Sequence, residues 1–271
     1  MVGLASGACC GGKIIRIGRR KTQLIMNCIG VVGVLMCIIV QNLYMLLLGR
    51  VIYGFAVGVT SVGMPRYLDE FVPLRRYSLC IGLYVLAINF GYVFALCGAV
   101  LLPPDTETQE LIDDNVSWRI LLGLPLIWFT VQELGFLFVI KNDGPSFYLG
   151  QKDYDGARDS FEKIYKTLGD TSHFDRFVAE FEKSKKMQGS SKVSIQQALC
   201  KDENYMRATW VNIADIFFHE MTGINVILQY SNTILENIFG DDTSSGFNAR
   251  TGTYVISWIN FLSAGLAVYT I

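Results

Sequence analysis

One short stretch of this chain places polar side chains inside an apolar segment. Residues 219–231 read HEMTGINVILQYS, with a histidine, a glutamate, an asparagine, a glutamine and a tyrosine among apolar residues. Ionisable and amide groups are costly at membrane depth, so they usually face a cavity or a partner. Gly223 lies among them and is a position at which a helix can bend or break. Polar groups beside an interrupted helix are typical of a transporter's binding site, whereas hydrogen bonds between packed helices are the alternative.

The composition indicates a membrane protein. Of the 271 residues, 51% are hydrophobic and 17% are charged, and the formal net charge is −1. A soluble globular domain is more polar than this, and a membrane-spanning helix needs roughly 20 mostly apolar residues. No segment combines dense Lys and Arg with aromatic residues, so nucleic acid is not an expected partner. No catalytic triad, phosphate-binding loop or metal-ligand spacing is found, so we expect neither an enzyme nor a cofactor or metal.

Seven apolar runs are the elements that must position these polar groups. They are predicted as helices over residues 1–15, 22–41, 43–64, 77–102, 118–140, 205–239 and 252–271. The first run is too short to span a membrane comfortably. The third contains a stripe of small residues that suits close contact between helices, namely Gly49, Gly54, Gly58 and Gly63.

The distribution of Lys and Arg predicts the orientation. The loop before Thr22, the loop 65–76 and the segment after Ile140 are basic, whereas no Lys or Arg lies between Tyr77 and Trp118. Basic loops stay on the cytoplasmic side. The lipid bilayer is therefore an expected partner, and the chain is predicted to cross it several times.

The long polar segment 141–204 is predicted to contain helices. An amphipathic helix begins near Asp153, with Tyr154, Ala157, Phe161, Ile164 and Leu168 on one face. A second is predicted over residues 174–186 and a shorter one over 194–199. Their apolar faces are expected to pack against the membrane domain.

Several motifs, taken in order along the chain, resemble the sugar porter family of the major facilitator superfamily. The basic loop Gly18–Lys21 is similar to the family's loop between helices 2 and 3, and residues 65–76, PRYLDEFVPLRR, are similar to its P-x-Y-x-x-E-x-x-P-x-x-x-R. Residues 222–231 resemble the helix 7 signature Q-Q-x-[ST]-G-I-N-x-x-x-Y-Y-S. Further similarities are Gly49-Arg50 at the start of helix 4, Trp118-Arg119 at the start of helix 6, residues 142–148 against P-E-S-P-R-[FYW]-L, and Asn260 on helix 8.

The resemblance implies an all-α membrane protein with a major facilitator superfamily fold. The family has twelve spanning helices, and this chain corresponds to helices 2 to 8, so we expect a truncated version or a piece of a longer protein. The implied domains are an N-terminal transmembrane bundle (1–140), a cytoplasmic helical linker (141–204) and the start of a C-terminal bundle (205–271). The implied location is the plasma membrane.

The resemblance also implies a function, the transport of a hexose or related sugar by alternating access. A sugar offers hydroxyl groups, so its site needs amide and carboxylate groups and an aromatic cover. The implied substrate-binding residues are His219, Glu220, Asn225, Tyr230 and Asn260. For Asn225, a hydrogen bond between helices is the alternative. Protons are a further candidate partner, although the family's coupling carboxylate lies on helix 1, which has no counterpart here.

Six charged residues are implied to form a conformational gate. The resemblance places them at helix ends on the inner face, where ion pairs lock the gate and part when it opens: Arg19, Arg20, Arg50, Glu70, Arg76 and Arg119. Isolated surface pairs are weak, which suits a gate that must open. The chain departs from the family's gate pattern at three positions, Ile15, Asp143 and Ser146.

The substrate positions also depart from the family pattern. His219 and Glu220 replace two glutamines, Val85 replaces the usual helix 5 glutamine, and Gln229 replaces a gating tyrosine. A polyol, a different sugar or no substrate at all is therefore a hypothesis. The alternative function is a non-transporting sugar sensor or a truncated, inactive transporter relative.

Overall fold

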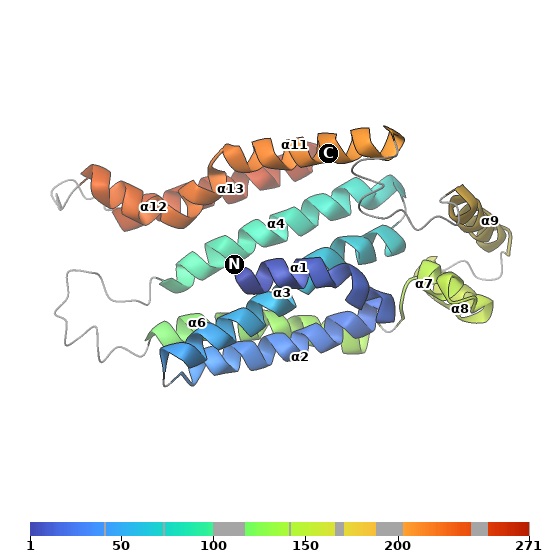
Figure 1. Cartoon of the computed structure of the whole chain (residues 1–271), viewed down its shortest axis with the longest axis horizontal. Coiled ribbons are helices and arrows are strands. Elements are labelled where there is room, and N and C mark those ends of the chain that lie inside the picture. The colour runs from blue at the N-terminus through green and yellow to red at the C-terminus, as the bar shows by residue number, and fades with distance from the viewer. Residues whose placement is uncertain are drawn as a thin grey trace. The chain divides into compact units, whose positions relative to one another are not determined.

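The structure of this chain is a computed structural model in which the described residues are helical and contain no strand (Figure 1). It describes residues 1–40, 42–72, 74–99, 117–140, 142–165, 171–187, 203–239 and 249–270. These residues divide into two compact units, and each unit is described by itself. The first contains Met1–Phe174 and Ala264–Ile271, and the second contains Asp175–Ser263.

Five of the described helices are long and apolar enough to cross a membrane. These spans are Arg19–Ile38 (α2), Leu43–Phe71 (α3), Arg76–Ala99 within α4 (Leu74–Ala99), Ser117–Val139 (α6 and η2) and Thr251–Thr270 within α13 (Ala249–Thr270). The first predicted run forms α1 (Val2–Ile14), which has only 13 residues. The run predicted over 205–239 is two helices, α11 (Glu203–Met221) and α12 (Ile224–Phe239).

Glycines bring α1 and α3 into backbone contact. A Cβ atom at Gly7 would lie 2.2 Å from the carbonyl oxygen of Phe55, and one at Gly3 would lie 2.3 Å from that of Val51. From the other side, a Cβ atom at Gly58 would lie 2.3 Å from the carbonyl oxygen of Leu4. The stripe of small residues predicted in the run 43–64, which is part of α3, therefore lies at a contact between helices, as expected.

Contacts of α2 with α3 and α6 complete the core of the first unit. Met26, Ala56 and Val59 form its buried centre. On the α6 side, the ring of Phe129 fills the space beside Gly30, where a Cβ atom would lie 2.5 Å from the ring. Phe129 also meets the ring of Tyr53 edge to face, with centroids 6.0 Å apart. A small residue thus admits an aromatic ring that joins three helices.

The last turn of the α6 segment is a π-helix, η2 (Gly135–Val139). The amide of Ile140 donates to the carbonyl of Gly135 at 2.9 Å, which is an i to i+5 hydrogen bond. A π-turn is a local widening of the helix that often occurs at functional sites. It ends one residue before the polar segment.

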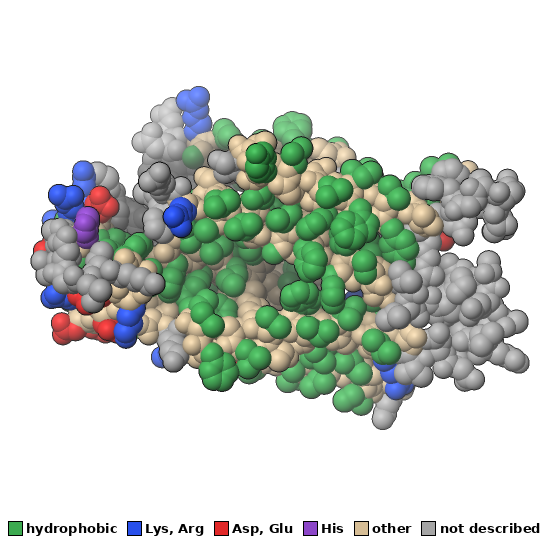
Figure 2. Space-filling view, turned by 180° about the vertical axis from the view of Figure 1, so that it is seen from behind, with side chains coloured by type: hydrophobic (Ala, Val, Ile, Leu, Met, Phe, Trp, Pro, Cys, Tyr) green, Lys and Arg blue, Asp and Glu red, His purple; other side chains and the backbone are tan. Residues whose placement is uncertain are grey.

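Exposed apolar side chains cover the outside of the spanning helices. Val32, Leu47, Leu83, Ile127 and Ile259, from five different helices, are each more than 40% exposed. Hydrophobic side chains dominate the face drawn in Figure 2. A water-soluble protein rarely exposes apolar surface on this scale, so the arrangement fits a protein that lies in lipid.

The polar segment forms short helices, as predicted. They are α7 (Pro145–Gly150), α8 (Tyr154–Tyr165) and α9 (Thr171–Met187). On α8 the predicted face is correct for Ala157 and Phe161, which are buried, and wrong for Tyr154, which is 51% exposed because it lies at the start of the helix. Leu168 and the predicted helix over 194–199 lie outside the described residues.

Candidate functional site

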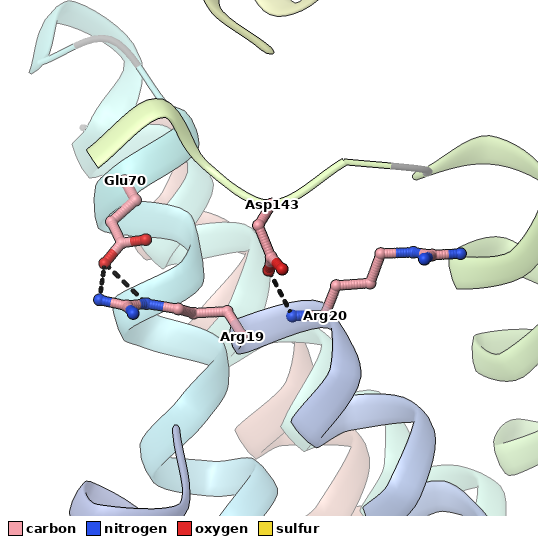
Figure 3. A network of polar contacts seen from close by, with 4 residues as sticks. All are labelled: Arg19, Arg20, Glu70 and Asp143. Atoms are coloured by element: carbon pink, nitrogen blue, oxygen red, sulfur yellow. Dashed lines mark hydrogen bonds and ion pairs between the residues drawn. The ribbon is translucent and has the colours of Figure 1, made fainter. Parts of the chain in front are cut away.

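An ion pair joins the start of α2 to the end of α3. Nε and Nη2 of Arg19 both donate to Oε1 of Glu70, at 2.9 Å and 2.6 Å (Figure 3). The Arg19 side chain is 21% exposed and that of Glu70 is 15% exposed. The Arg19 guanidinium also lies 5.1 Å from the ring centre of Phe147, on α7. Since both charges are largely withdrawn from solvent, the pair is stronger than an exposed one.

Arg20 ties the same end of α2 to the segment that follows η2. Its backbone N–H donates to Oδ1 of Asp143 at 2.7 Å. A carboxylate is favourable there because the first amide groups of a helix carry partial positive charge. Figure 3 shows the Arg20 side chain pointing away from Asp143. It donates instead to the carbonyls of Phe136, at 3.0 Å and 2.9 Å, and of Ile140, at 2.8 Å.

Further hydrogen bonds fix the segment that carries Asp143. The carbonyl of Asp143 accepts from the Ser160 hydroxyl on α8 at 2.6 Å, and the carbonyl of Asn142 accepts from the Tyr67 hydroxyl on α3 at 3.3 Å. A Cβ atom at Gly144 would lie 3.1 Å from Cβ of Glu70. We call Arg19, Arg20, Glu70 and Asp143 the inner network. It joins α2, α3 and the segment after η2.

The structure does not bring all six predicted gate residues together. Arg50 and Glu70 lie about 30 Å apart along α3, at the 1.5 Å rise of an α-helix. Arg119 lies in the first turn of α6, with its guanidinium 5.1 Å from the ring centre of Trp118, whereas the inner network meets the other end of that segment. The expectation that Arg50 and Arg119 share one inner face with Arg19, Arg20 and Glu70 is therefore wrong.

Arg76 lies at the start of α4, six residues after Glu70, but it is not part of the inner network. It is exposed in the first turn of α4, shortly after Glu70 in the chain. It forms no ion pair with a described residue. A partner for Arg76 in another conformation stays a prediction.

The predicted break in the helix of residues 219–231 is confirmed. α11 ends at Met221, Gly223 has φ +74°, and α12 begins at Ile224. The Thr222 hydroxyl donates to the carbonyl of His219 at 2.6 Å, and the amide of Gly223 donates to that of Glu220 at 3.1 Å. Glycine is favoured at a helix end of this kind because the left-handed conformation strains residues with a Cβ atom.

The predicted substrate-binding residues surround this break or lie on the next helix. His219 and Glu220 are exposed at the end of α11, and Tyr230 is 57% exposed on α12. Asn225 lies in the first turn of α12, and its side chain is outside the described part of the structure. Asn260 is partly buried on α13. The placement supplies polar groups on both sides of a broken helix, and their role in binding stays a prediction.

Residues 1–271 match the family described as Sugar (and other) transporter. The chain belongs to this sugar transporter family. Among its relatives, the galactose-proton symporter of Escherichia coli (strain K12) is 28% identical over 271 residues, covering 99% of this chain and 53% of the relative. Sugar transport protein 11 of Arabidopsis thaliana is 28% identical over 261 residues, covering 95% and 47%. Hexose transporter 2 of Kluyveromyces lactis is 27% identical over 259 residues, covering 94% and 43%.

This sugar transporter family chain spans about half the length of the curated relatives that it matches. The match confirms the predicted family, and the spanning helices confirm an all-α membrane protein of the major facilitator superfamily.

Sequence reasoning missed one polar contact in this sugar transporter family chain. Nδ2 of Asn27, on α2, donates to Oε2 of Glu133, on α6, at 3.0 Å, and Asn27 is 1% exposed. The signal was available, because Glu133 is an acidic residue inside a predicted spanning run and such residues are functional candidates by default.

Proposed function

We propose that this chain takes part in the transport of a hexose or related sugar across a membrane by alternating access. The observation that carries the proposal is the inner network, in which the start of α2, the end of α3 and the segment after η2 are held by charged hydrogen bonds. The match to the sugar transporter family and to relatives named for galactose and hexose transport supports it. The proposed location is the plasma membrane.

The inner network acts as a gate in this proposal. Arg19 and Glu70 hold α2 against α3, and Arg20 and Asp143 hold α2 against the segment that leads to α7. If these helix ends move apart, both contacts break together because they start from adjacent residues. Oε2 of Glu70 is buried without a hydrogen-bond partner, so a second donor could pair with it in another conformation. Arg76 is the proposed donor.

The proposed sugar site consists of His219, Glu220, Asn225, Tyr230 and Asn260. A new helix, α12, begins at Ile224 directly after the break at Gly223, and the first amide groups of a helix lack partners within it and are available to hydroxyl oxygens. Asn225 and Asn260 can each donate to and accept from a sugar hydroxyl. Tyr230 supplies the aromatic cover. The domain boundaries at residues 140 and 204 belong to the same proposal.

Proton coupling is a further part of the proposal. Two relatives carry it in their names, the galactose-proton symporter and the proton myo-inositol cotransporter hmit-1.1 of Caenorhabditis elegans, which is 27% identical over 230 residues. A transmembrane pH gradient should then drive sugar accumulation. If sugar uptake does not change with the pH gradient, the proposal is restricted to facilitated diffusion.

A non-transporting sugar sensor is the second candidate function. The observation that favours it is the pair His219 and Glu220, which places ionisable groups where the family pattern has neutral amides. A sensor would bind sugar without moving it. Sugar that shifts the melting temperature of the purified protein, but is not taken up by reconstituted vesicles, would identify a sensor.

The test of the transport proposal is uptake of labelled hexoses by cells that express the full-length protein and lack their own sugar carriers. We expect Asn225→Ala to raise KM at least fivefold, since leaving a buried sugar hydroxyl unpaired costs about 1–3 kcal/mol. Asn232→Ala is the matched control, because Asn232 already pairs with Glu236 on the same helix. Wild-type KM in the Asn225 variant would exclude it from the site.

A further inference from the structure

Three buried oxygen atoms lie without hydrogen-bond partners in the contact between α2 and α3. They are Oε1 of Gln23, Oδ1 of Asn27 and Oγ1 of Thr60. Gln23 and Asn27 are each 1% exposed, and their spacing of four residues puts them on one face of α2. Buried polar atoms are nearly always hydrogen-bonded. A group of unpaired oxygen atoms therefore indicates a bound water or cation that contacts them.

A carboxylate faces the same group from α6. Glu133 accepts from the Asn27 amide at 3.0 Å, and no described cation pairs with it. It lies within the candidate span Ser117–Val139, where an uncompensated negative charge is costly. When ionised, the carboxylate therefore needs a positive partner, and none of the described side chains supplies one.

One aromatic contact lies on each side of the level of Thr60 and Glu133. Tyr53 meets Phe129 with ring centres 6.0 Å apart, and Tyr67 meets Phe136 with ring centres 5.8 Å apart. Thr60 lies midway between the two tyrosines on the same face of α3, and Glu133 lies between the two phenylalanines on α6.

The side chain of Gln23, on α2, lies beside α3 close to Thr60 in the helix. A Cβ atom at Gly63, one turn after Thr60, would lie 2.8 Å from Nε2 of Gln23. Gln23, Asn27, Thr60 and Glu133 thus form one polar layer between two aromatic layers, and we call it the polar layer.

We propose that the polar layer binds a sodium ion. The available ligands are all oxygens, from one carboxylate, two amides and one hydroxyl, which is the donor set of a hard cation. Groups of three or more His, Cys, Asp or Glu side chains are absent among the described residues, which argues against a transition metal. One carboxylate balances one positive charge, whereas calcium sites usually contain several carboxylates. This site is separate from the proposed sugar site and does not rest on the transport proposal.

Thermal unfolding of the purified full chain in detergent tests the sodium site. Sodium chloride is compared with choline chloride at equal ionic strength. We expect sodium to raise Tm progressively with its concentration, by roughly 2–4 °C at about five times Kd. Glu133→Gln keeps the shape of the side chain and removes its charge, and it should abolish this rise and the binding of radioactive sodium.

Glu236→Gln is the matched control, because Glu236 is also held by an asparagine amide but is exposed on α12. It should keep the full sodium response. If Glu133→Gln does not fold, Thr60→Val removes one ligand with little change in volume and should raise the half-saturating sodium concentration at least tenfold. Equal Tm in both salts, an unchanged response in Glu133→Gln or Thr60→Val, or stabilisation by acid in place of sodium would each overturn the proposal.

Discussion

The inner network and the break at Gly223 show two ways in which this chain places polar groups in an apolar protein. The inner network gathers residues that are far apart in sequence, such as Arg19, Glu70 and Asp143, and holds each by a hydrogen bond. His219, Glu220 and Asn225 are instead close in sequence, and local backbone geometry at the break puts the first two on α11 and the third on α12.

The difference lies in what holds each region. The inner network depends on tertiary contact, since α2, α3 and α6 must pack before its charges can meet. The break depends on local structure, because a glycine with φ +74° ends one helix and lets the next begin. Mutations in the network should therefore act on stability and transport together, whereas mutations at the break should act mainly on transport.

The largest effect is expected from Glu70→Ala. It leaves the Arg19 guanidinium largely buried without its partner, and breaking a fully buried pair costs about 3–5 kcal/mol, so we expect the lower end of that range. Tm should fall by several degrees, and hexose uptake should fall at least tenfold after correction for the amount of protein at the cell surface.

Glu162→Ala is the matched control for Glu70→Ala. Glu162 pairs with Arg158 on the exposed face of α8, with side chains 44% and 50% exposed, so its loss should cost at most about 0.5 kcal/mol. If uptake by the two variants is equal, the inner network is not a gate.

Gly7→Ala tests whether packing positions the first unit. The new Cβ atom would lie 2.2 Å from a backbone oxygen of α3, so the two helices must separate, at a cost of about 1–3 kcal/mol. Gly12→Ala lies on the same helix with no atom within 4 Å, and it should leave Tm unchanged or raise it slightly. A Gly7 variant as stable as the Gly12 variant would contradict the close contact of α1 with α3.

Among the three test substitutions, controls aside, Gly223→Ala should have the smallest effect on stability. A residue with a Cβ atom in the left-handed conformation costs about 1–2 kcal/mol, and nothing lies within 4 Å of the added atom. We expect uptake to fall more than Tm, because a change at the break moves the start of α12. Gly91→Ala, in the interior of α4 with open space around it, should instead stabilise its helix by about 1 kcal/mol. Equal effects of the two substitutions on uptake would show that the break has no special role.

The features that could be predicted from the sequence are those that follow from hydrophobic runs and from local residue patterns. The spanning helices follow from run length, the close contact of α1 and α3 agrees with the glycine stripe, and the break at Gly223 follows from a glycine among polar residues. Residue type alone, in contrast, wrongly grouped Arg50 with Glu70. Their separation is set by the length of one helix, which counting residues along it would have shown.

Contacts between distant residues were beyond prediction from one sequence. The hydrogen bond from Asn27 to Glu133 joins residues 106 positions apart, and it depends on Gly30 admitting the ring of Phe129 one turn away. The role of the Arg20 side chain was missed for a similar reason, because its acceptors are backbone carbonyls within η2 and directly after its end. Periodic patterns predict which face of a helix is buried, but not which polar group it meets.

The π-turn η2 also sets the direction in which the chain leaves α6 towards α7. Such a turn holds one residue more than the α-helical turn that it replaces. Deletion of one residue between Gly135 and Val139 would restore regular winding and rotate the following segment by roughly 100° about the helix axis, with a shift of about 1.5 Å. Asp143 would then turn away from the start of α2, and Pro145 would begin α7 in a different direction. One inserted residue in an apolar run thus determines where the polar segment leaves the membrane domain.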